Sequence, residues 1–403
     1  MKAFNPTKPL KGIRIADFTV HAAGPFSTHL MSMLGAECIK IESSKRLDVF
    51  RKPHPVYGRM TAASFAQVAA NKKSIQINLK DPKGLELAKR VISISDVMCE
   101  SFRPGVMERL GLGYEVLKKI KPDIVMLSIS AQGQTGPERT YAGYAPLFGA
   151  TGGVGTLTGY QDGPPVEVRH VMDHSSGFNA AMATLAALYR RKRTGVGAHV
   201  DVSAREVATS FIGQALFQYS ATGESVHRQG NDMPPHAPNN VYPCLGLDKW
   251  VSISVASDKE WQNLAKKMGD EQLLTHSHFT HAASRWEHRH DMDLRIASWT
   301  RKHTREEVTA LLQSVGVAAF PSYNAQDIAD DSHMRQRGSV CDLSSSEGET
   351  RRVVGPPWLF SRTPASLDTW TPKMGEHNHY IFGELLGMSE TEINQLIEQK
   401  VID

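Results

Sequence analysis

The residue with the clearest chemical potential in this sequence is Asp173, which stands in the segment Val-Met-Asp-His-Ser-Ser-Gly. Alanines and leucines dominate the next stretch, residues 178–188, and predict a buried helix there. A carboxylate at the start of such a helix is partly desolvated, which suits a nucleophile or a general base. The alternative is an N-cap, because Asp also accepts hydrogen bonds from free backbone N–H groups. Taken alone, this local pattern favours the cap.

The first glycine turn of the chain does not carry a dinucleotide fingerprint. Residues 12–17, 26–34 and 37–42 read as strand, helix and strand, which is a compact β-α-β unit. Its turn holds Ala22-Ala23-Gly24-Pro25 instead of G-x-G-x-x-G, so NAD or FAD binding is not predicted. The sequence also has no P-loop and no G-x-S-x-G nucleophile elbow.

Histidines and cysteines do not form a recognisable metal pattern. Five histidines fall between residues 276 and 290, but they lack H-E-x-x-H spacing and a cysteine partner, and their segment is rich in charged residues. We therefore expect a surface helix and loop there, and no metal site. The four cysteines show no CxxC spacing and are interpreted as reduced thiols.

Composition restricts the classes of partner. The chain has 403 residues, with 46 Lys+Arg against 42 Asp+Glu, a net charge of +4. The basic residues are scattered, so nucleic-acid binding is not predicted, whereas an anionic small molecule would suit the mild positive balance. No stretch reaches the roughly 18 apolar residues of a membrane span, and no apolar segment opens the chain. We expect a soluble cytoplasmic protein without membrane attachment.

Strand and helix patterns alternate through the first half of the chain. This alternation predicts an α/β fold whose large domain is an open, Rossmann-like parallel sheet. Residues 149–155 are glycine-rich and predict either a flexible lid or a tight turn. The polar, proline-rich residues 223–240 indicate a boundary. We expect residues 1–224 to form the N-terminal part of the large domain, 225–325 a smaller α+β domain, and 326–403 a return to the large domain.

Several segments together resemble the family III CoA-transferases of the CaiB/BaiF type. They include Leu34-Gly-Ala-Glu-Cys-Ile-Lys-Ile-Glu42 and Asp96-Val-Met-Cys-Glu-Ser-Phe-Arg-Pro-Gly105. The resemblance covers nearly the whole chain, through residues 9–18, 23–25, 34–42, 71–80, 96–105, 109–113, 133–137, 187–191, 194–197 and 375–377. Each fragment is weak alone, but their order and spacing are highly specific.

This resemblance implies an enzyme that moves CoA from an acyl-CoA donor, such as succinyl-CoA, to a small carboxylic acid. Asp173 falls at the family's nucleophile position. The implied mechanism begins with attack of this carboxylate on the thioester, which gives a mixed anhydride and CoA thiolate. The thiolate then forms an aspartyl-CoA thioester, and the acceptor acid reverses both steps. Water must be excluded, and we expect residues 149–155 near the anhydride.

The resemblance also implies a set of CoA contacts. Arg109 matches a position that binds the CoA phosphates, and Tyr144 matches a ring that lines the CoA channel. Arg103 is added on charge, because phosphates favour guanidinium groups. The further segments that line the CoA site contribute Ala23, Lys73, Ser101 and Phe102.

The chain departs from formyl-CoA transferase-like members at three polar positions. Their Gln, Arg and Glu are replaced here by Ala22, Ser43 and Ala145, and their glycine loop has no counterpart near residues 230–245. A site without these groups is roomier, so we expect an acceptor bulkier than formate or oxalate, either aromatic or a longer dicarboxylic acid.

The sequence leaves open two alternative functions and the oligomeric state. An α-methylacyl-CoA racemase-like enzyme would need a His where this chain reads Gly143-Tyr144-Ala145, so racemisation is disfavoured. A CoA-binding partner subunit of a heteromeric transferase is disfavoured because Asp173 is retained. The resemblance implies an intertwined homodimer of two interlocked rings, or a heteromer with a related subunit.

Overall fold

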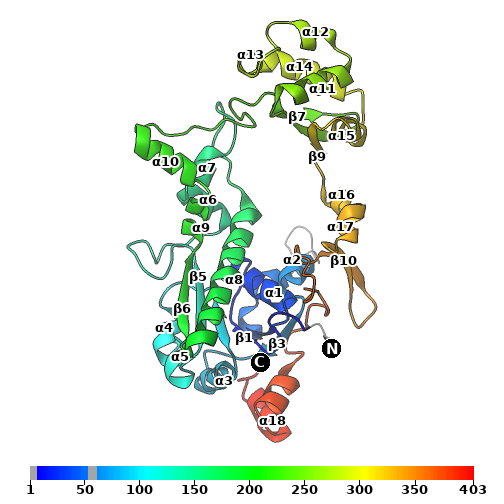
Figure 1. The fold of residues 1–403 in the computed structure, drawn as a ribbon. Coiled ribbons are helices and arrows are strands. Elements are labelled where there is room, and N and C mark those ends of the chain that lie inside the picture. Colours follow the sequence, from blue (N-terminus) through cyan, green and yellow to red (C-terminus); the bar gives the residue numbers. More distant parts are fainter. Residues whose placement is uncertain (1–6, 53–60) are drawn as a thin grey trace. The chain divides into compact units, whose positions relative to one another are not determined.

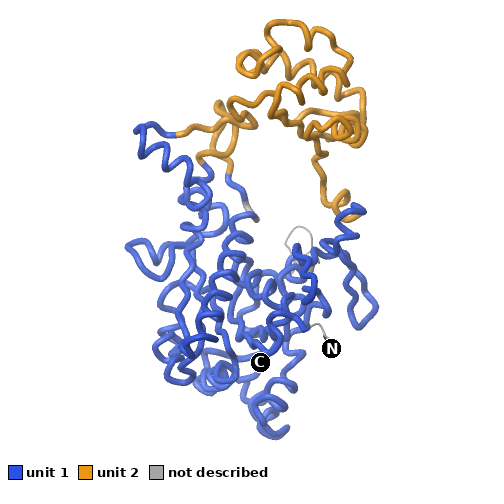
Figure 2. Tube along the Cα trace, in the orientation of Figure 1, with its two compact units in different colours: residues 1–155, 167–225, 331–403 blue, residues 156–166, 226–330 orange. Residues whose placement is uncertain are grey.

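The computed structural model describes residues 7–52 and 61–403, and these form two compact units (Figure 2). Unit 1 comprises Met1–Gly155, Glu167–Ser225 and Asp331–Asp403, and unit 2 comprises Thr156–Val166 and Val226–Asp330. Each unit contains buried hydrophobic clusters of its own, so each is described by itself.

Unit 1 is built on a six-stranded, fully parallel sheet of order β3-β2-β1-β4-β5-β6 (Figure 1). The chain therefore moves outward from β1 to β3 and then crosses back to start again at β4, which is the doubly wound arrangement. The predicted α/β fold with an open parallel sheet is confirmed. The strands are β1 (Arg14–Asp17), β2 (Glu37–Glu42), β3 (Lys72–Gln76), β4 (Val97–Glu100), β5 (Val125–Ser130) and β6 (Ala198–Ser203).

Helices cover this sheet and bury the apolar sides of the strands. α3 (Pro82–Ser93) shows why such helices form: Asp81 caps it by accepting from the backbone N–H of Lys83, and Pro82 opens its first turn. Its buried residues recur at helical spacing. The other helices of this part are α1 (Ala23–Met33), α2 (Thr61–Ala69), α4 (Val106–Arg109), α5 (Tyr114–Ile120), α9 (Ala204–Ser210) and α10 (Gly213–Thr222), with short 3₁₀ turns at Ser44–Arg46 and Val49–Arg51.

The C-terminal segment packs against the same core. Ile381 and Ile393 lie in one hydrophobic cluster with Ile39 and Ile75 of the sheet. α18 (Glu390–Glu398) begins with a capping box. The remaining elements are α17 (Ser332–Gln336), the antiparallel hairpin β10 (Val340–Ser344) and β11 (Thr350–Val354), and a π-helix at His379–Leu385.

The helix that carries Asp173 is longer than predicted. α8 spans Arg169–Thr194, so Asp173 lies inside the helix, and Val168 occupies the N-cap position. The N-cap interpretation of Asp173 is therefore wrong. The polar first turns are helical because they pack on α1 (Figure 1): a Cβ at Gly177 would stand 2.8 Å from the Ala23 carbonyl oxygen. This tertiary contact overrides weak local propensity. The expected burial is also only partial, because Ala186 is exposed.

The glycine-rich segment is helical rather than a lid. α6 (Ala145–Thr151) and α7 (Val154–Leu157) are joined by Gly152 and Gly153, and Gly153 has a φ of 89°. A Cβ at Gly152 would lie 2.5 Å from the Ala208 side chain, so glycine allows this close turn. Of the two predictions for residues 149–155, the tight turn between packed elements is confirmed and the flexible lid is wrong.

Unit 2 contains a three-stranded antiparallel sheet of order β7-β8-β9. Its core gathers around Trp261, whose side chain is buried and whose indole N–H donates to the Leu273 carbonyl. No helix within residues 7–52 and 61–403 is long and apolar enough to cross a membrane. The elements are β7 (Asn239–Pro243), β8 (Trp250–Ser254), β9 (Ala318–Pro321), α11 (Asp258–Met268), α12 (Glu271–Thr275), α13 (Ala282–Glu287), α14 (Arg289–Thr300), α15 (Arg305–Gln313) and α16 (Ala325–Asp330).

Candidate active site

A pocket of about 580 Å³ lies at the carboxyl ends of the central strands of unit 1. The loop after β1, the loop after β4 and the end of β5 all contribute to its lining. Between β1 and β4 the chain reverses its direction of travel across the sheet, and this is the place where open α/β sheets bind ligands. The site therefore follows from strand order rather than from any single motif.

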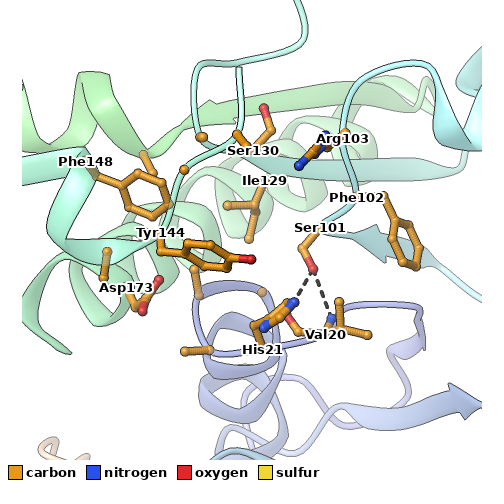
Figure 3. A pocket seen from close by; sticks show the side chains of 18 of the residues that line it. Val20, His21, Ser101, Phe102, Arg103, Ile129, Ser130, Tyr144, Phe148 and Asp173 are labelled. Atoms are coloured by element: carbon orange, nitrogen blue, oxygen red, sulfur yellow. Dashed lines mark hydrogen bonds between the residues drawn. The ribbon is translucent and has the colours of Figure 1, made fainter. Parts of the chain in front are cut away.

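Asp173 reaches this pocket from α8. His174 packs its ring against Phe26 of α1 at a centroid distance of 4.4 Å, and Phe178 packs on the same ring at 5.3 Å. These contacts fix the rotation of α8, so the preceding residue, Asp173, faces the pocket beside Tyr144 (Figure 3). Asp173 is half-buried, so its carboxylate is partly desolvated and still accessible.

The loop after β1 is held in place by the loop after β4. The Ser101 hydroxyl accepts from the backbone N–H of Val20 at 3.0 Å and donates to the Val20 carbonyl at 3.2 Å (Figure 3). The next residue, His21, has a φ of 66°, a conformation that non-glycine residues seldom adopt. Its ring lies edge-on to Tyr144, with the centroids 6.1 Å apart. Strained backbone conformations of this kind cluster at active sites and ligand-binding sites.

Below the pocket lies a sealed network of charges around Asp17. The Lys72 ammonium donates to the Asp17 carboxylate at 2.9 Å and to the Pro25 carbonyl at 2.9 Å, and both charged side chains are fully buried. The ammonium of Lys40 donates to the Thr19 carbonyl at 3.0 Å. Burial alone would raise the pKa of Asp17, but the two ammonium groups hold it below its ordinary value. The network anchors the start of α1 from beneath.

A second buried carboxylate lies at the end of β4. The backbone N–H of Phe102 donates to Glu100 Oε2 at 2.7 Å, which fixes the turn into the pocket. Burial raises the pKa of Glu100 to about 7. The end of β5 adds Ser130, whose buried hydroxyl finds no hydrogen-bond partner within the described chain.

A narrower, mainly apolar pocket of about 390 Å³ adjoins the first one. The two pockets share Val20 and Phe102 in their linings. Arg46 also lines both, and its guanidinium lies 5.3 Å from the Phe102 ring centroid. Arg109 lines the second pocket, where Gly105, in a left-handed conformation, leaves room for its side chain. The cationic groups of this second pocket are Lys40, Lys45, Arg46, Lys80 and Arg109.

Most of the predicted site residues line one of the two pockets, and Lys73 lines neither. The residues of the larger pocket include Ala23, Ser101, Phe102, Arg103, Tyr144 and Asp173. Arg109 lies in the adjoining pocket. Lys73 lines neither: it sits on β3 with its ammonium 4.6 Å from the ring centroid of Tyr380. Successive strand residues face opposite sides, so Lys73 points away from its neighbour Lys72.

Several lining residues were not predicted. Lys80, which follows β3, supplies a cation of the kind expected of Lys73. The sequence signal for Lys80 was its position in segment 71–80, which resembles the family III CoA-transferases. His21 and Arg139 line the larger pocket, and no local pattern marks them. Residues 149–155, expected near the intermediate, do not line it.

Metal chemistry finds no support in the side-chain arrangement. Within residues 7–52 and 61–403, no three His, Cys, Asp or Glu side chains gather as a metal site would require. In the histidine-rich segment of unit 2, the rings of His278 and His288 stack at 3.6 Å.

A half-buried carboxylate and several basic groups at the switch point of a doubly wound sheet are an arrangement typical of ligand-binding α/β enzymes. The chain matches the model of CoA-transferase family III over residues 10–378. It is similar to the succinyl-CoA–D-citramalate CoA-transferase of Chloroflexus aurantiacus, with 34% identity over 100% of each chain. It is also similar to the succinyl-CoA–L-malate CoA-transferase beta subunit of that organism, with 32% identity over 100% of each chain.

Comparison with a solved structure agrees with this family assignment. The CAIB/BAIF family protein from Brucella suis has a TM-score of 0.86 and 30% identity, and the match covers 94% of this chain and 100% of that one. The chain belongs to CoA-transferase family III, and it is an enzyme of that class. The family predicted from the sequence is confirmed.

Proposed function

We propose that this protein transfers CoA from succinyl-CoA to a carboxylic acid bulkier than formate or oxalate, with Asp173 as the covalent nucleophile. The observation that carries the proposal is the half-buried Asp173 in a pocket that shares lining residues with a second one, which is lined by several cationic side chains. Attack of Asp173 on the thioester carbonyl forms an anhydride and releases CoA thiolate. The thiolate then attacks the aspartyl carbonyl, releases the donor acid and forms the aspartyl-CoA thioester.

The two pockets match the two parts of CoA. The apolar pocket accommodates the adenine ring, and Arg109, Lys80 and Arg46 at its rim suit the phosphates. The neutral pantetheine arm passes Phe102 into the larger pocket, where its sulfur meets Asp173. Ala23 and Ser101 shape the floor of this passage, and Tyr144 forms its wall. Lys73 has no part in this arrangement.

The acceptor follows from the space around Asp173. Ala22 and Ala145, which stand where formyl-CoA transferase-like members carry polar groups, both line the larger pocket and leave its centre open. The relatives named above act on citramalate and malate by their names, which supports a longer dicarboxylic acid over an aromatic one. Good turnover of oxalate beside poor turnover of larger acids would contradict this proposal.

Mass spectrometry tests the covalent step. The protein is incubated with succinyl-CoA, treated with hydroxylamine or borohydride, and digested. We expect modification only on the peptide that carries Asp173, and none in Asp173→Asn. Asp201→Asn is the matched control, because Asp201 lies on β6 outside both pockets and should leave the modification intact. A protein that binds CoA but stays unmodified by several acyl-CoA donors would rule out covalent transfer.

We also propose that two copies of this chain associate through α10 and the neighbouring face of α8. Not one residue of α10 is buried, although the helix carries Leu216, Phe217 and Tyr219, and Phe217 is 75% exposed. Apolar surface of this kind favours a protein partner. The intertwined homodimer implied by the family resemblance supplies one.

Light scattering after size-exclusion chromatography tests this association. The wild-type protein should have twice the chain mass, and Phe217→Glu should shift it toward the monomer. Leu247→Glu is the control, because Leu247 is 94% exposed but lies in unit 2. A monomeric wild-type protein at all concentrations would contradict the proposal, and a requirement for a different subunit would favour the heteromer.

A second candidate function, racemisation at the α-carbon of an acyl-CoA, gains support from His21. The sequence offered no second base, but His21 lines the same pocket as Asp173 and lies beside Tyr144. A His and an Asp on one pocket suit proton removal and return. Deuterium uptake at the α-carbon of a 2-methylacyl-CoA in D₂O, lost in His21→Asn, would favour this function. Transfer without such uptake would exclude it.

A further inference from the structure

The larger pocket contains more positive charge than its chemistry with CoA requires. Asp173 is the single carboxylate among its lining residues in the described chain. Against it stand the guanidinium groups of Arg46, Arg103 and Arg139. A concave site with this excess of basic groups attracts an anion, and guanidinium groups suit carboxylates in particular because they bind them through two parallel hydrogen bonds.

Arg46 lines both pockets, whereas Arg139 lines the larger one only. Arg46 also lines the apolar pocket and stacks near Phe102, so it serves the nucleotide end. Arg139 lines the larger pocket only, in the segment between β5 and α6 that also supplies Tyr141 and Tyr144. That segment carries the wall next to Asp173, which Figure 3 shows from close by.

The charge of Arg139 is not neutralised within the described chain. Its neighbour Glu138 forms an ion pair with Arg205, so this nearby carboxylate is already engaged. No described Asp or Glu forms an ion pair with Arg139, whose side chain is exposed to the pocket. A guanidinium left unpaired in a ligand pocket is available to the ligand.

CoA itself does not supply the missing anion. Its negative charges are the phosphates of the nucleotide part, and the pantetheine arm between these phosphates and the sulfur is neutral. With the nucleotide in the apolar pocket, the anion near Arg139 must come from the acyl group or from the acceptor acid. A carboxylate that reacts with Asp173 is consumed in the anhydride or thioester, so a second, unreacted carboxylate is required.

We propose that Arg139 binds the free carboxylate of a dicarboxylic substrate, and that one binding position serves donor and acceptor in turn. This inference rests on the proposed function. The succinyl group carries its free carboxylate to Arg139 while its thioester carbon faces Asp173. After succinate leaves, the acceptor places one carboxylate against the aspartyl-CoA thioester and the other on Arg139. The site therefore selects dicarboxylic acids in both half-reactions, because both half-reactions share this geometry.

The test compares donors that differ only in the free carboxylate. Succinyl-CoA and butyryl-CoA have acyl chains of equal length, and both are assayed with wild type and with Arg139→Gln. We expect kcat/KM for succinyl-CoA to fall about 10- to 100-fold, as for a lost charged hydrogen-bond pair, with butyryl-CoA unchanged. Arg139→Lys should restore part of the loss, because it keeps the charge without the planar fork. Lys119→Gln, an exposed cation on α5 that lines neither pocket, is the control.

Two outcomes would overturn the inference: equal losses for both donors in Arg139→Gln, or a wild-type enzyme that uses butyryl-CoA as well as succinyl-CoA. Failure of the proposed function looks different, because then the wild type transfers CoA from neither donor. In that case calorimetry with succinate and the CoA-loaded protein still decides the matter. Binding that is lost in Arg139→Gln supports the carboxylate site, and equal or absent binding in both proteins contradicts it.

Discussion

Two carboxylates of unit 1, Asp17 and Asp173, have surroundings that differ in kind. Asp17 is completely buried and shares its oxygens among Lys72, Thr19 and Thr28. Asp173 is half-buried and faces a pocket that is lined by several guanidinium groups. Asp17 has a charged partner inside the protein, whereas basic side chains outnumber carboxylates in the lining of the pocket that holds Asp173.

The two carboxylates therefore have different expected roles: Asp17 stabilises the fold, and Asp173 is the group proposed to react with substrate. A buried ion pair is strongly destabilising to break, because the remaining charge stays buried without a partner. The Asp17 network therefore fixes the backbone that forms the pocket floor. In the proposed function Asp173 must instead meet its substrate, and it faces a pocket that a substrate can enter. Variants of the Asp17 network should therefore change stability, whereas variants of Asp173 should change activity.

The largest effect is expected from Asp173→Asn. An amide cannot form the anhydride, so the rate of CoA transfer should fall at least about 10³-fold. The free energy of unfolding should change by no more than about 1 kcal/mol, because the side chain is only half-buried. A chromatographic assay of CoA esters and urea denaturation measure the two quantities. A variant that loses stability instead of activity would show that Asp173 belongs with Asp17.

The opposite response is expected from Lys72→Met. The Asp17 carboxylate would remain buried without its main partner, so the free energy of unfolding should fall by about 3–5 kcal/mol. Because the folded-state pKa of Asp17 is lowered, its contribution to stability is present above about pH 4 and is lost as pH falls further. The variant should show less of this acid dependence.

Lys73→Met is the matched control for this experiment. Lys73 is the next residue of β3, but its ammonium lies over Tyr380 on the other side of the strand. A loss below about 1 kcal/mol is expected, as for an exposed contact. Similar losses for both variants in urea denaturation would contradict the special role of the buried pair.

Glu100→Gln should alter the pH dependence of stability above the acid range. The folded protein keeps a proton on Glu100 up to about pH 7, whereas an ordinary Glu releases it near 4.5. Between these values the folded state binds more protons than the unfolded state, so stability decreases as pH rises. Glutamine does not ionise and should remove this decrease, which amounts to at most about 3 kcal/mol. Urea denaturation at pH 4.5, 6 and 8 measures it, and parallel curves for both proteins would refute the assignment.

The smallest effect is expected from Gly177→Ala at the contact of α1 with α8. The added Cβ would stand 2.8 Å from the Ala23 carbonyl oxygen and 2.9 Å from the Phe26 ring. Overpacking of this kind costs about 1–3 kcal/mol, and the shifted helix should lower kcat by about tenfold. Gly383→Ala, whose Cβ meets nothing closer than 3.8 Å, is the control. Unchanged activity in both variants would mean that the position of Asp173 does not depend on this contact.

The sequence by itself determined the alternation of strands and helices and singled out Asp173 as the candidate nucleophile. β2 lies at the predicted residues 37–42, and β1 and α1 overlap the strand and the helix predicted at 12–17 and 26–34, since hydrophobic spacing acts over a few positions. The family was also readable, because its short motifs keep their order along nearly the whole chain.

Only the tertiary structure decided how Asp173 is held and which side chains share its pocket. The polar start of α8 is helical because it packs on α1, a contact about 150 residues apart in sequence. His21 and Arg139 reach the pocket from loops after different strands, and Lys73 faces the other side of the sheet. The physical reason is that secondary structure follows from neighbours in sequence, whereas a binding site at a sheet edge is assembled from loops that only strand order brings together.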